Sequence, residues 1–202
     1  MPKLDLKREI AAYSARRGAF EVVEVPPVRC LMIDGRGDPN SSAEYRDALE
    51  ALFPVAYKLK FLSKRDLRRD YVVMPLEGLW WADDMTSFTT ARDKSRWSWT
   101  LLNVVPDWIE AEHVEHVRGL VDASPAVEKL RFEEFAEGRC VQTLHVGPYD
   151  EEGPVLAELH ERFIPAQGLR MTGRHHEIYL SDARRTAPEK LKTILRQPVA
   201  DA

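Results

Sequence analysis

The sequence has little cysteine and no long apolar run. Only two cysteines, Cys30 and Cys140, occur in 202 residues, and each lies in an apolar segment far from the other. Buried free thiols are therefore expected rather than a disulfide, which suits a reducing compartment. No stretch has the length and apolarity of a membrane span or of a signal peptide. We therefore expect a cytoplasmic protein with no membrane partner.

An excess of basic residues is also absent. Lysine and arginine together number 29 against 33 aspartates and glutamates, so the formal net charge is -4. This balance argues against a nucleic-acid partner, because such surfaces are usually basic. The length and the 44% hydrophobic content are sufficient for one domain, or for two small modules that share a core.

Two parts of the chain share an order of local signals. FEVVEVPPVRCLMIDG (20–35) and LRFEEFAEGRCVQTLHVG (130–147) each have extended character, contain Arg-Cys and end at glycine. A helical pattern follows each one, over 41–62 and 151–168. The first helix is predicted to begin with a capping box from Ser41 to Glu44 and to kink or restart at Pro54, a residue that interrupts helical hydrogen bonding.

Each part then continues with two further predicted strands. The first strand of each pair contains a glutamate, in DYVVMPLEGLWW and GRHHEIYLS, and the second ends at a proline, in WSWTLLNVVP and LKTILRQP. The predicted class is α+β, with strand-helix-strand-strand modules, antiparallel sheets and a central ligand cleft. We expect a single domain, 1–202, with repeats at about 20–106 and 130–199 and a connecting helix at 107–123.

The two glutamates lie among aromatic residues. Alternation along a strand places Glu77 with Trp81, and Trp80 on the opposite side. The same alternation groups Glu177 with His175 and Tyr179. Aromatic faces attract flat or cationic ligands, and a carboxylate among them supplies charge complementarity or proton transfer. The alternative is that the tryptophans fill the core and the glutamates are half-exposed strand residues.

Other motifs point less directly to a site. The glycines of DGRGDPN (34–40) lack the Lys-Ser/Thr ending of a phosphate loop and predict a turn. His175, His176 and Glu177 do not have the spacing of a helical zinc motif, so no metal and no cofactor are predicted. Tyr149 follows a strand end and is a candidate ligand contact.

Several segments together resemble the GyrI-like small-molecule-binding family in its stand-alone form. They are VPPVRCLMIDGRGDPN, PLEGLWW, HVGPYDEEGP and HHEIYLSDARRTAPEKLKTILRQP, in that order along the chain. The resemblance covers about residues 4–199 and implies a duplicated strand-helix-strand-strand (SHS2-type) fold. It also implies that Glu177 is the family's acid, with Tyr179 beside it.

Three functions follow from the resemblance. The first is binding of planar aromatic, often cationic, small molecules or xenobiotics. The alternative is a hydrolase that opens cyclopropane-bearing DNA alkylators, with Glu177 and Tyr179 as catalytic residues, and the third is a protein inhibitor of the gyrase-inhibitor type. The sequence leaves open the physiological ligand, turnover and the oligomeric state. The predicted ligand-binding residues are Glu77, Trp80, Trp81, Trp97, Trp99, Tyr149, Glu177 and Tyr179.

Overall fold

The computed structural model describes residues 3–83 and 93–202. The chain has a mixed α/β fold, and its described strand ladders are antiparallel. It divides into two compact units whose segments interleave along the sequence. The first unit contains Met1–Glu9, Val28–Met74 and Trp81–Phe135, and the second contains Ile10–Pro27, Pro75–Trp80 and Ala136–Ala202.

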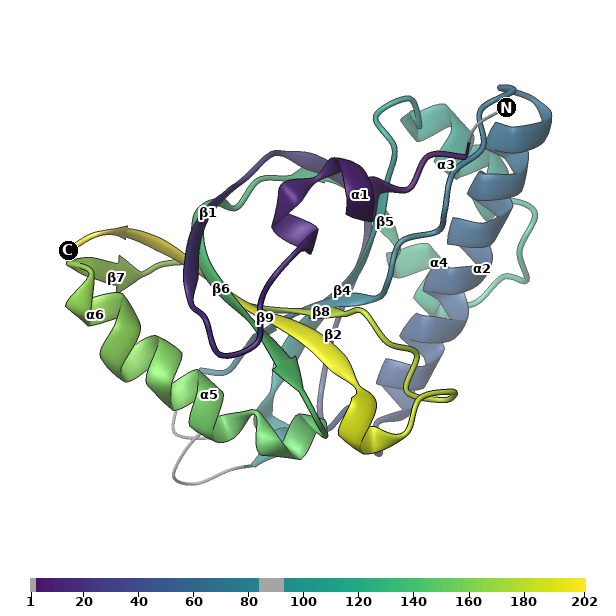
Figure 1. Cartoon of the computed structure of the whole chain (residues 1–202). Coiled ribbons are helices and arrows are strands. Elements are labelled where there is room, and N and C mark those ends of the chain that lie inside the picture. Colours follow the sequence, from purple (N-terminus) through teal and green to yellow (C-terminus); the bar gives the residue numbers. More distant parts are fainter. Residues whose placement is uncertain (1–2, 84–92) are drawn as a thin grey trace. The chain divides into compact units, whose positions relative to one another are not determined.

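The first unit combines three strands with helices. In ladder order its strands are β4 (Ser98–Val105), β2 (Val28–Arg36) and β5 (Arg131–Phe135). Its helices are α1 (Leu6–Glu9), α2 (Ala43–Arg65), the 3-10 turn η3 (Lys94–Arg96), α3 (Ala111–Arg118) and α4 (Pro125–Lys129). Helix α2 packs on β2 and β4 and runs beside α3 and α4 (Figure 1). Buried leucines from both layers, among them Leu31, Leu52 and Leu101, form the core of the unit.

Helix α2 departs from two predictions. Its N-cap is Ser42, whose hydroxyl accepts the backbone N–H of Tyr45, so the predicted cap at Ser41 was one residue early. The helix also continues through Pro54 to Arg65, so the predicted restart at Pro54 does not occur. Pro54 is exposed, whereas Val55 and Leu59 bury the opposite side of the helix, and this packing holds the helix together across the missing hydrogen bond.

The second unit is built on a curled antiparallel sheet (Figure 1). Its order is β1 (Glu21–Val25), β6 (Gly138–Val146), β9 (Lys192–Asp201), β8 (His175–Tyr179) and β3 (Glu77–Trp81). The short strand β7 (Leu169–Met171) also pairs with β9. Its helical segments are η1 (Ala11–Tyr13), η4 (Tyr149–Glu151), α5 (Gly153–Ala157), η5 (Glu158–Phe163), α6 (Ile164–Ala166) and η6 (Pro188–Lys190).

The helical run from α5 to α6 passes through a π-turn at η5. The N–H of Ile164 bonds to the carbonyl of Leu159, five residues back. Pro165 follows and has no N–H to give to the carbonyl of Glu161, so the ordinary bond four residues back is unavailable at that point. Leu159 and Ile164 are buried with Val141 and Val199 in a core cluster on this side of the sheet.

The two sequence halves follow the predicted order of strand, helix, strand and strand only in part, because each predicted first extended segment forms two strands and the second half has an additional strand, β7, after its helix. The predicted first extended segment is divided at Pro26 and Pro27, because a proline has no N–H for a strand ladder. Its first part, β1, pairs with β6, and β3 pairs with β8, so the second compact unit contains segments from both sequence halves. A duplication of two SHS2-type modules stays a prediction.

Candidate functional site

The pairing of β3 with β8 sorts the predicted site residues onto two faces. Residues directly opposite in an antiparallel ladder share a face. Gly78 pairs with Glu177 and Trp80 with His175, whereas Glu77 pairs with Ile178. Glu77 and Glu177 therefore point to opposite faces of the strand pair, and the expectation that both acids share one site is not met within it.

One face carries a row of hydrogen bonds that ends at a carboxylate. The indole Nε1 of Trp80 donates to Tyr179 Oη over 3.0 Å, and Tyr179 Oη donates to Glu177 Oε2 over 2.6 Å. The indole lies above Gly78, where a Cβ would stand 2.7 Å from Nε1. A glycine at this position therefore makes room for the indole, and the indole in turn fixes the phenol beside the acid.

Tyr149 completes an aromatic surface next to Glu177. Its ring meets that of Tyr179 edge to face, with centroids 5.5 Å apart. Burial, and then the charges of Glu152, Glu177 and Asp182, raise the pKa of Tyr149 to about 12. The phenol therefore stays protonated at neutral pH in an environment of negative potential.

Two imidazoles lie on the same side of β8. Nε2 of His175 is 3.5 Å from Oε1 of Glu177, and the ring of His175 meets that of His160 edge to face at 5.6 Å. His160 belongs to the π-turn η5. Burial, and then the proximity of His175, lower the pKa of His160 to about 4, so this imidazole is neutral at physiological pH.

The opposite face of β8 belongs to a buried ionic network that sequence reasoning missed. Glu77 accepts the Tyr13 hydroxyl over 2.5 Å and lies 3.0 Å from His176 Nε2. His176 Nδ1 is 2.9 Å from Glu137, and Glu137 is also 2.9 Å from Arg196 Nη1. Local sequence carries little signal of this network, because its members are brought together from five separate segments.

The charges of the network stabilise one another. Burial disfavours the charged form of His176, but Glu137 and Glu77 outweigh burial and raise its pKa to about 9. Burial likewise disfavours ionised Glu137, yet His176 and Arg196 lower the pKa of that carboxyl to about 2. Arg196 also donates to Gln142 and to the carbonyl of Ala12. We interpret this face as structural, since both oxygens of Glu77 have partners inside the protein.

Three predicted aromatic residues belong to the first unit. Trp99 is fully buried, and its ring stands directly over Gly35, its partner across the ladder, where a Cβ would be 2.1 Å from the indole. It also meets Tyr45 edge to face at 5.2 Å, so its position is that of a core residue. Trp81 and Trp97 are half-buried. A ligand contact by any of the three stays a prediction.

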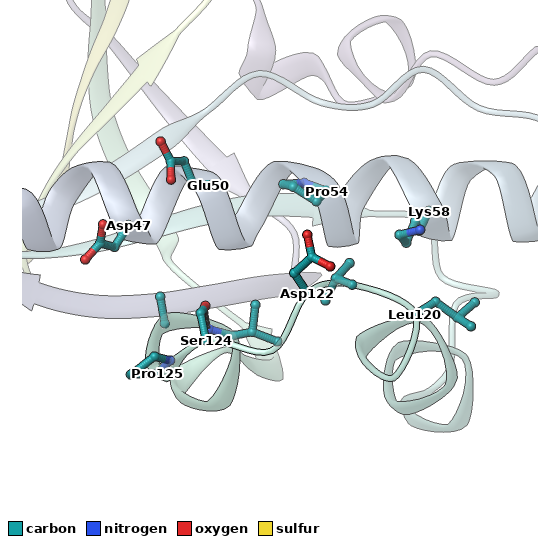
Figure 2. A pocket seen from close by; sticks show the side chains of 11 residues that line it. Asp47, Glu50, Pro54, Lys58, Leu120, Asp122, Ser124 and Pro125 are labelled. Atoms are coloured by element: carbon teal, nitrogen blue, oxygen red, sulfur yellow. Dashed lines mark hydrogen bonds between the residues drawn. The ribbon is translucent and has the colours of Figure 1, made fainter.

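The first unit has an open groove of about 470 Å³ between α2 and the segment that joins α3 to α4. Figure 2 shows Asp47, Glu50, Pro54 and Lys58 along the helix, and Asp122 and Ser124 opposite them. None of the predicted site residues lines this groove. Its three acids are exposed to solvent, which weakens their pull on a ligand cation, so we place the candidate site at Glu177 instead.

The described ranges contain neither a cluster of metal ligands nor a membrane-spanning helix. Within 3–83 and 93–202, no group of three or more His, Cys, Asp or Glu side chains is arranged to hold a metal ion. No helix in that part of the chain is long and apolar enough to cross a membrane.

Comparisons with known proteins agree with this fold. The model of the GyrI-like small molecule binding domain matches residues 19–200. A conserved uncharacterized protein from Listeria innocua is 38% identical, with a TM-score of 0.86, over 98% of this chain and 100% of that chain. A hydrolase from Listeria innocua is also 38% identical over the same shares, with a TM-score of 0.82. The C-terminal domain of EcmrR, 12% identical with a TM-score of 0.59 over 91% of this chain and 98% of that one, is similar in fold. A comparison with curated proteins finds no match.

Proposed function

The chain belongs to the GyrI-like small-molecule-binding family, and from this premise we propose that it binds planar aromatic cations at the Glu177 face of β8. The observation that carries the proposal is the row from Trp80 through Tyr179 to Glu177, with Tyr149 edge-on beside it. Aromatic rings beside a carboxylate attract a flat cation by stacking, cation–π attraction and charge pairing at once.

Glu177 presents its two oxygens differently. Oε2 accepts the only proton that the Tyr179 hydroxyl has to give, and the Trp80 N–H fixes the direction of that hydroxyl. No hydrogen bond from the described residues reaches Oε1, and the ring Nε2 of His175 lies 3.5 Å from it. The side chain of Glu177 is 15% exposed. Oε1 is therefore the oxygen that we assign to the ligand cation.

The surrounding charges favour a cation over an anion. Glu152, Glu177 and Asp182 all act on the Tyr149 phenol in the same direction. Asp182 is paired with Arg184, which reduces its share of the negative potential. Glu152 and Glu177 thus both contribute negative potential at the aromatic surface. Glu177 is partly desolvated, at 15% exposed, which strengthens its attraction for a cation.

Binding of ethidium, a permanently charged planar cation, tests this proposal. Calorimetry and the quenching of tryptophan fluorescence should both report binding to the folded protein, because Trp80 lies beside the site. Glu177→Gln keeps the volume and the acceptor for Tyr179, and should weaken ethidium by about tenfold, corresponding to roughly 1.4 kcal/mol. Glu161→Gln removes an exposed acid of the same unit and is the matched control. Equal affinity of wild type and Glu177→Gln would contradict the proposal.

Hydrolysis is the second candidate, because two similar Listeria proteins, 38% and 37% identical, are named as hydrolases. For a cyclopropane-bearing alkylator, water oxygen would bond to the strained carbon as the ring C–C bond breaks. The electrons of that bond would pass to the conjugated carbonyl, which takes a proton and becomes a phenol. Tyr149 is the proposed donor to this carbonyl, because Tyr179 donates to Glu177. Glu177 would accept the proton of the attacking water.

Mass spectrometry separates hydrolysis from binding. A cyclopropane-bearing alkylator incubated with the protein should gain one water, and Glu177→Gln should lower the rate by about 10²-fold, which is typical of lost acid-base help. Tyr149→Phe should also lower the rate, whereas Glu161→Gln should not. Retention of the intact alkylator by the wild-type protein, without addition of water, would leave binding as the function.

A further inference from the structure

The function proposed above leaves two buried imidazoles without a role. His175 is 9% exposed, and neither of its ring nitrogens forms a hydrogen bond within the described residues. The same holds for Nε2 of His160. Buried polar atoms without partners are uncommon in folded proteins, and they call for a physical explanation. Both rings lie on the Glu177 side of β8, and His160 is brought there by the π-turn η5.

The position of His175 relative to Glu177 suggests such an explanation. Its Nε2 is 3.5 Å from Oε1, which is too long for a hydrogen bond but close enough to become an ion pair when the imidazole carries a proton. Oε1 is the oxygen that we assign to a ligand cation, because Oε2 is held by Tyr179. A protonated His175 and a bound cation would therefore require the same carboxylate oxygen.

We propose that His175 is a pH-dependent competitor for the cation site, which must lose its proton before Glu177 can bind a cationic ligand. This inference rests on the proposed function, because it presumes that the ligand cation meets Glu177. His175 is a positioning and gating residue here, and it needs no contact with the ligand. His160 supports it edge-on and keeps its ring in place beside Oε1.

The neighbours of His175 determine which groups respond to pH. On β8 its face also carries Glu177 and Tyr179, and across the ladder it meets Trp80 of β3, which does not titrate. Strand β9 presents Leu195 opposite Glu177 and Thr193 opposite Tyr179, and neither of these titrates.

The helical side of the site contributes His160. Its pKa of about 4 keeps it neutral between pH 5.5 and 8. An ordinary carboxylate is ionised throughout that window, in which a histidine commonly changes charge. The sign follows directly: the affinity for a cation is low at acidic pH, where His175 holds Oε1, and rises as the pH rises.

Ethidium titrations between about pH 5.5 and pH 8 test the gate in the full chain. For the wild type we expect the dissociation constant to fall by about tenfold across this range, since one proton is displaced per cation bound. In His175→Gln, which keeps a polar side chain that does not titrate, the affinity should be high and independent of pH. Phenanthridine, the uncharged ring system, serves as the control ligand and should bind with a pH-independent affinity.

The outcomes of the ethidium titrations distinguish the pH-dependent role of His175 from the proposed binding function on which it rests. Ethidium binding that is independent of pH in the wild type overturns the gate and leaves the proposed function standing. A pH dependence that persists in His175→Gln also overturns the gate. Failure of the folded wild type to bind ethidium at pH 8 overturns the proposed function, and the gate with it.

A second measurement requires no variant. Calorimetry at pH 6 in two buffers of different ionisation enthalpy counts the protons released when ethidium binds. The gate predicts the release of a substantial fraction of one proton by the wild type at pH 6 and close to none at pH 8. Equal values at the two pH values, or uptake of protons, would overturn it.

Discussion

The two faces of strand β8 put similar side chains to different uses. On one face His176 lies between two carboxylates, Glu77 and Glu137, and is fully buried with both ring nitrogens close to acids. On the other face His175 and Glu177 are neighbours at 3.5 Å, with Oε1 of the acid still available. Successive residues of one strand, HHE, therefore supply both a structural ion pair and a candidate ligand site.

This difference shows how the extent of burial decides whether a carboxylate stabilises the fold or can bind a ligand. A buried charge costs less when every lone pair and proton has a partner, and such a network favours one structure. A carboxylate that keeps one oxygen unpaired gains a partner when a cation arrives. The network on the His176 face holds the strand in place, and Oε1 of Glu137, which has no hydrogen bond within the described residues, is shielded because that side chain is only 3% exposed. Glu177 is 15% exposed and retains the capacity to bind a cation.

The largest expected effect comes from breaking the buried ionic network at Glu137. Glu137→Gln leaves charged His176 and Arg196 without the carboxylate that both contact at 2.9 Å. Removing one partner of a buried ion pair typically costs about 3–5 kcal/mol, because an uncompensated charge stays buried. Urea unfolding should show a loss of this size in the free energy of unfolding.

The matched variant on the other face is Glu177→Gln. Its amide oxygen still accepts the Tyr179 proton, so its free energy of unfolding should change by less than about 1 kcal/mol. Equal losses in the two variants would remove the distinction between the faces.

The next largest effect is a dependence of stability on pH, with a loss at the alkaline end and another at the acidic end. The pKa of His176 is raised from 6.5 to about 9, so its contribution to stability is complete below pH 6.5 and is lost as the pH rises through 9. The pKa of Glu137 is lowered from 4.5 to about 2, so its contribution is complete above pH 4.5 and is lost as the pH falls toward 2. Thermal unfolding midpoints should therefore be highest between about pH 4.5 and 6.5.

Comparison of wild type with His176→Gln tests whether His176 causes the loss of stability at alkaline pH. The stability gap between wild type and His176→Gln should be largest near pH 6 and narrow by a few kcal/mol as the pH approaches 9. A gap that is constant with pH would show that His176 is not held charged by its acids.

Sequence alternation was sufficient to predict one face of β8 but not the other. It grouped His175, Glu177 and Tyr179 correctly, because the period of a strand is strictly two residues. The role of Glu77 was missed, since its partners Tyr13 and His176 come from distant segments and depend on which strand lies beside β3. Matched places in the sequence suggested a shared site, yet direct pairing of β3 with β8 places the two acids back to back.

The same limit applies to the aromatic residues and the prolines. Neither the glycine beneath Trp80 nor the one beneath Trp99 was recognised as a packing partner, because each contact depends on three-dimensional geometry that alternation alone does not specify. Two of the residues proposed as one cage therefore have clear packing roles. Pro54 was expected to kink or restart α2, but the helix does not restart there, because burial of the opposite helical face overrides local propensity.

The smallest of the effects expected from disturbed packing or charge concerns Gly78, whose ladder partner is Glu177. A methyl group there would stand 2.7 Å from Trp80 Nε1, and the indole is buried and hydrogen-bonded to Tyr179, so it has little freedom to shift. Overpacking of this kind costs about 1–3 kcal/mol, while the lower backbone entropy of alanine in the unfolded chain returns about 0.5–1 kcal/mol. Gly78→Ala should therefore lower the free energy of unfolding by about 1–2 kcal/mol, as measured by urea unfolding.

The same variant tests whether the two faces are independent. Because the displaced indole no longer holds Tyr179 against Glu177, ethidium binding should weaken as well. The loss of stability at alkaline pH that we assign to His176 should still occur at the same pH. A shift in the pH of this alkaline loss of stability in Gly78→Ala would show that the two faces are coupled through the strand. The Glu177 site could then not be altered independently of the ionic network on the opposite face.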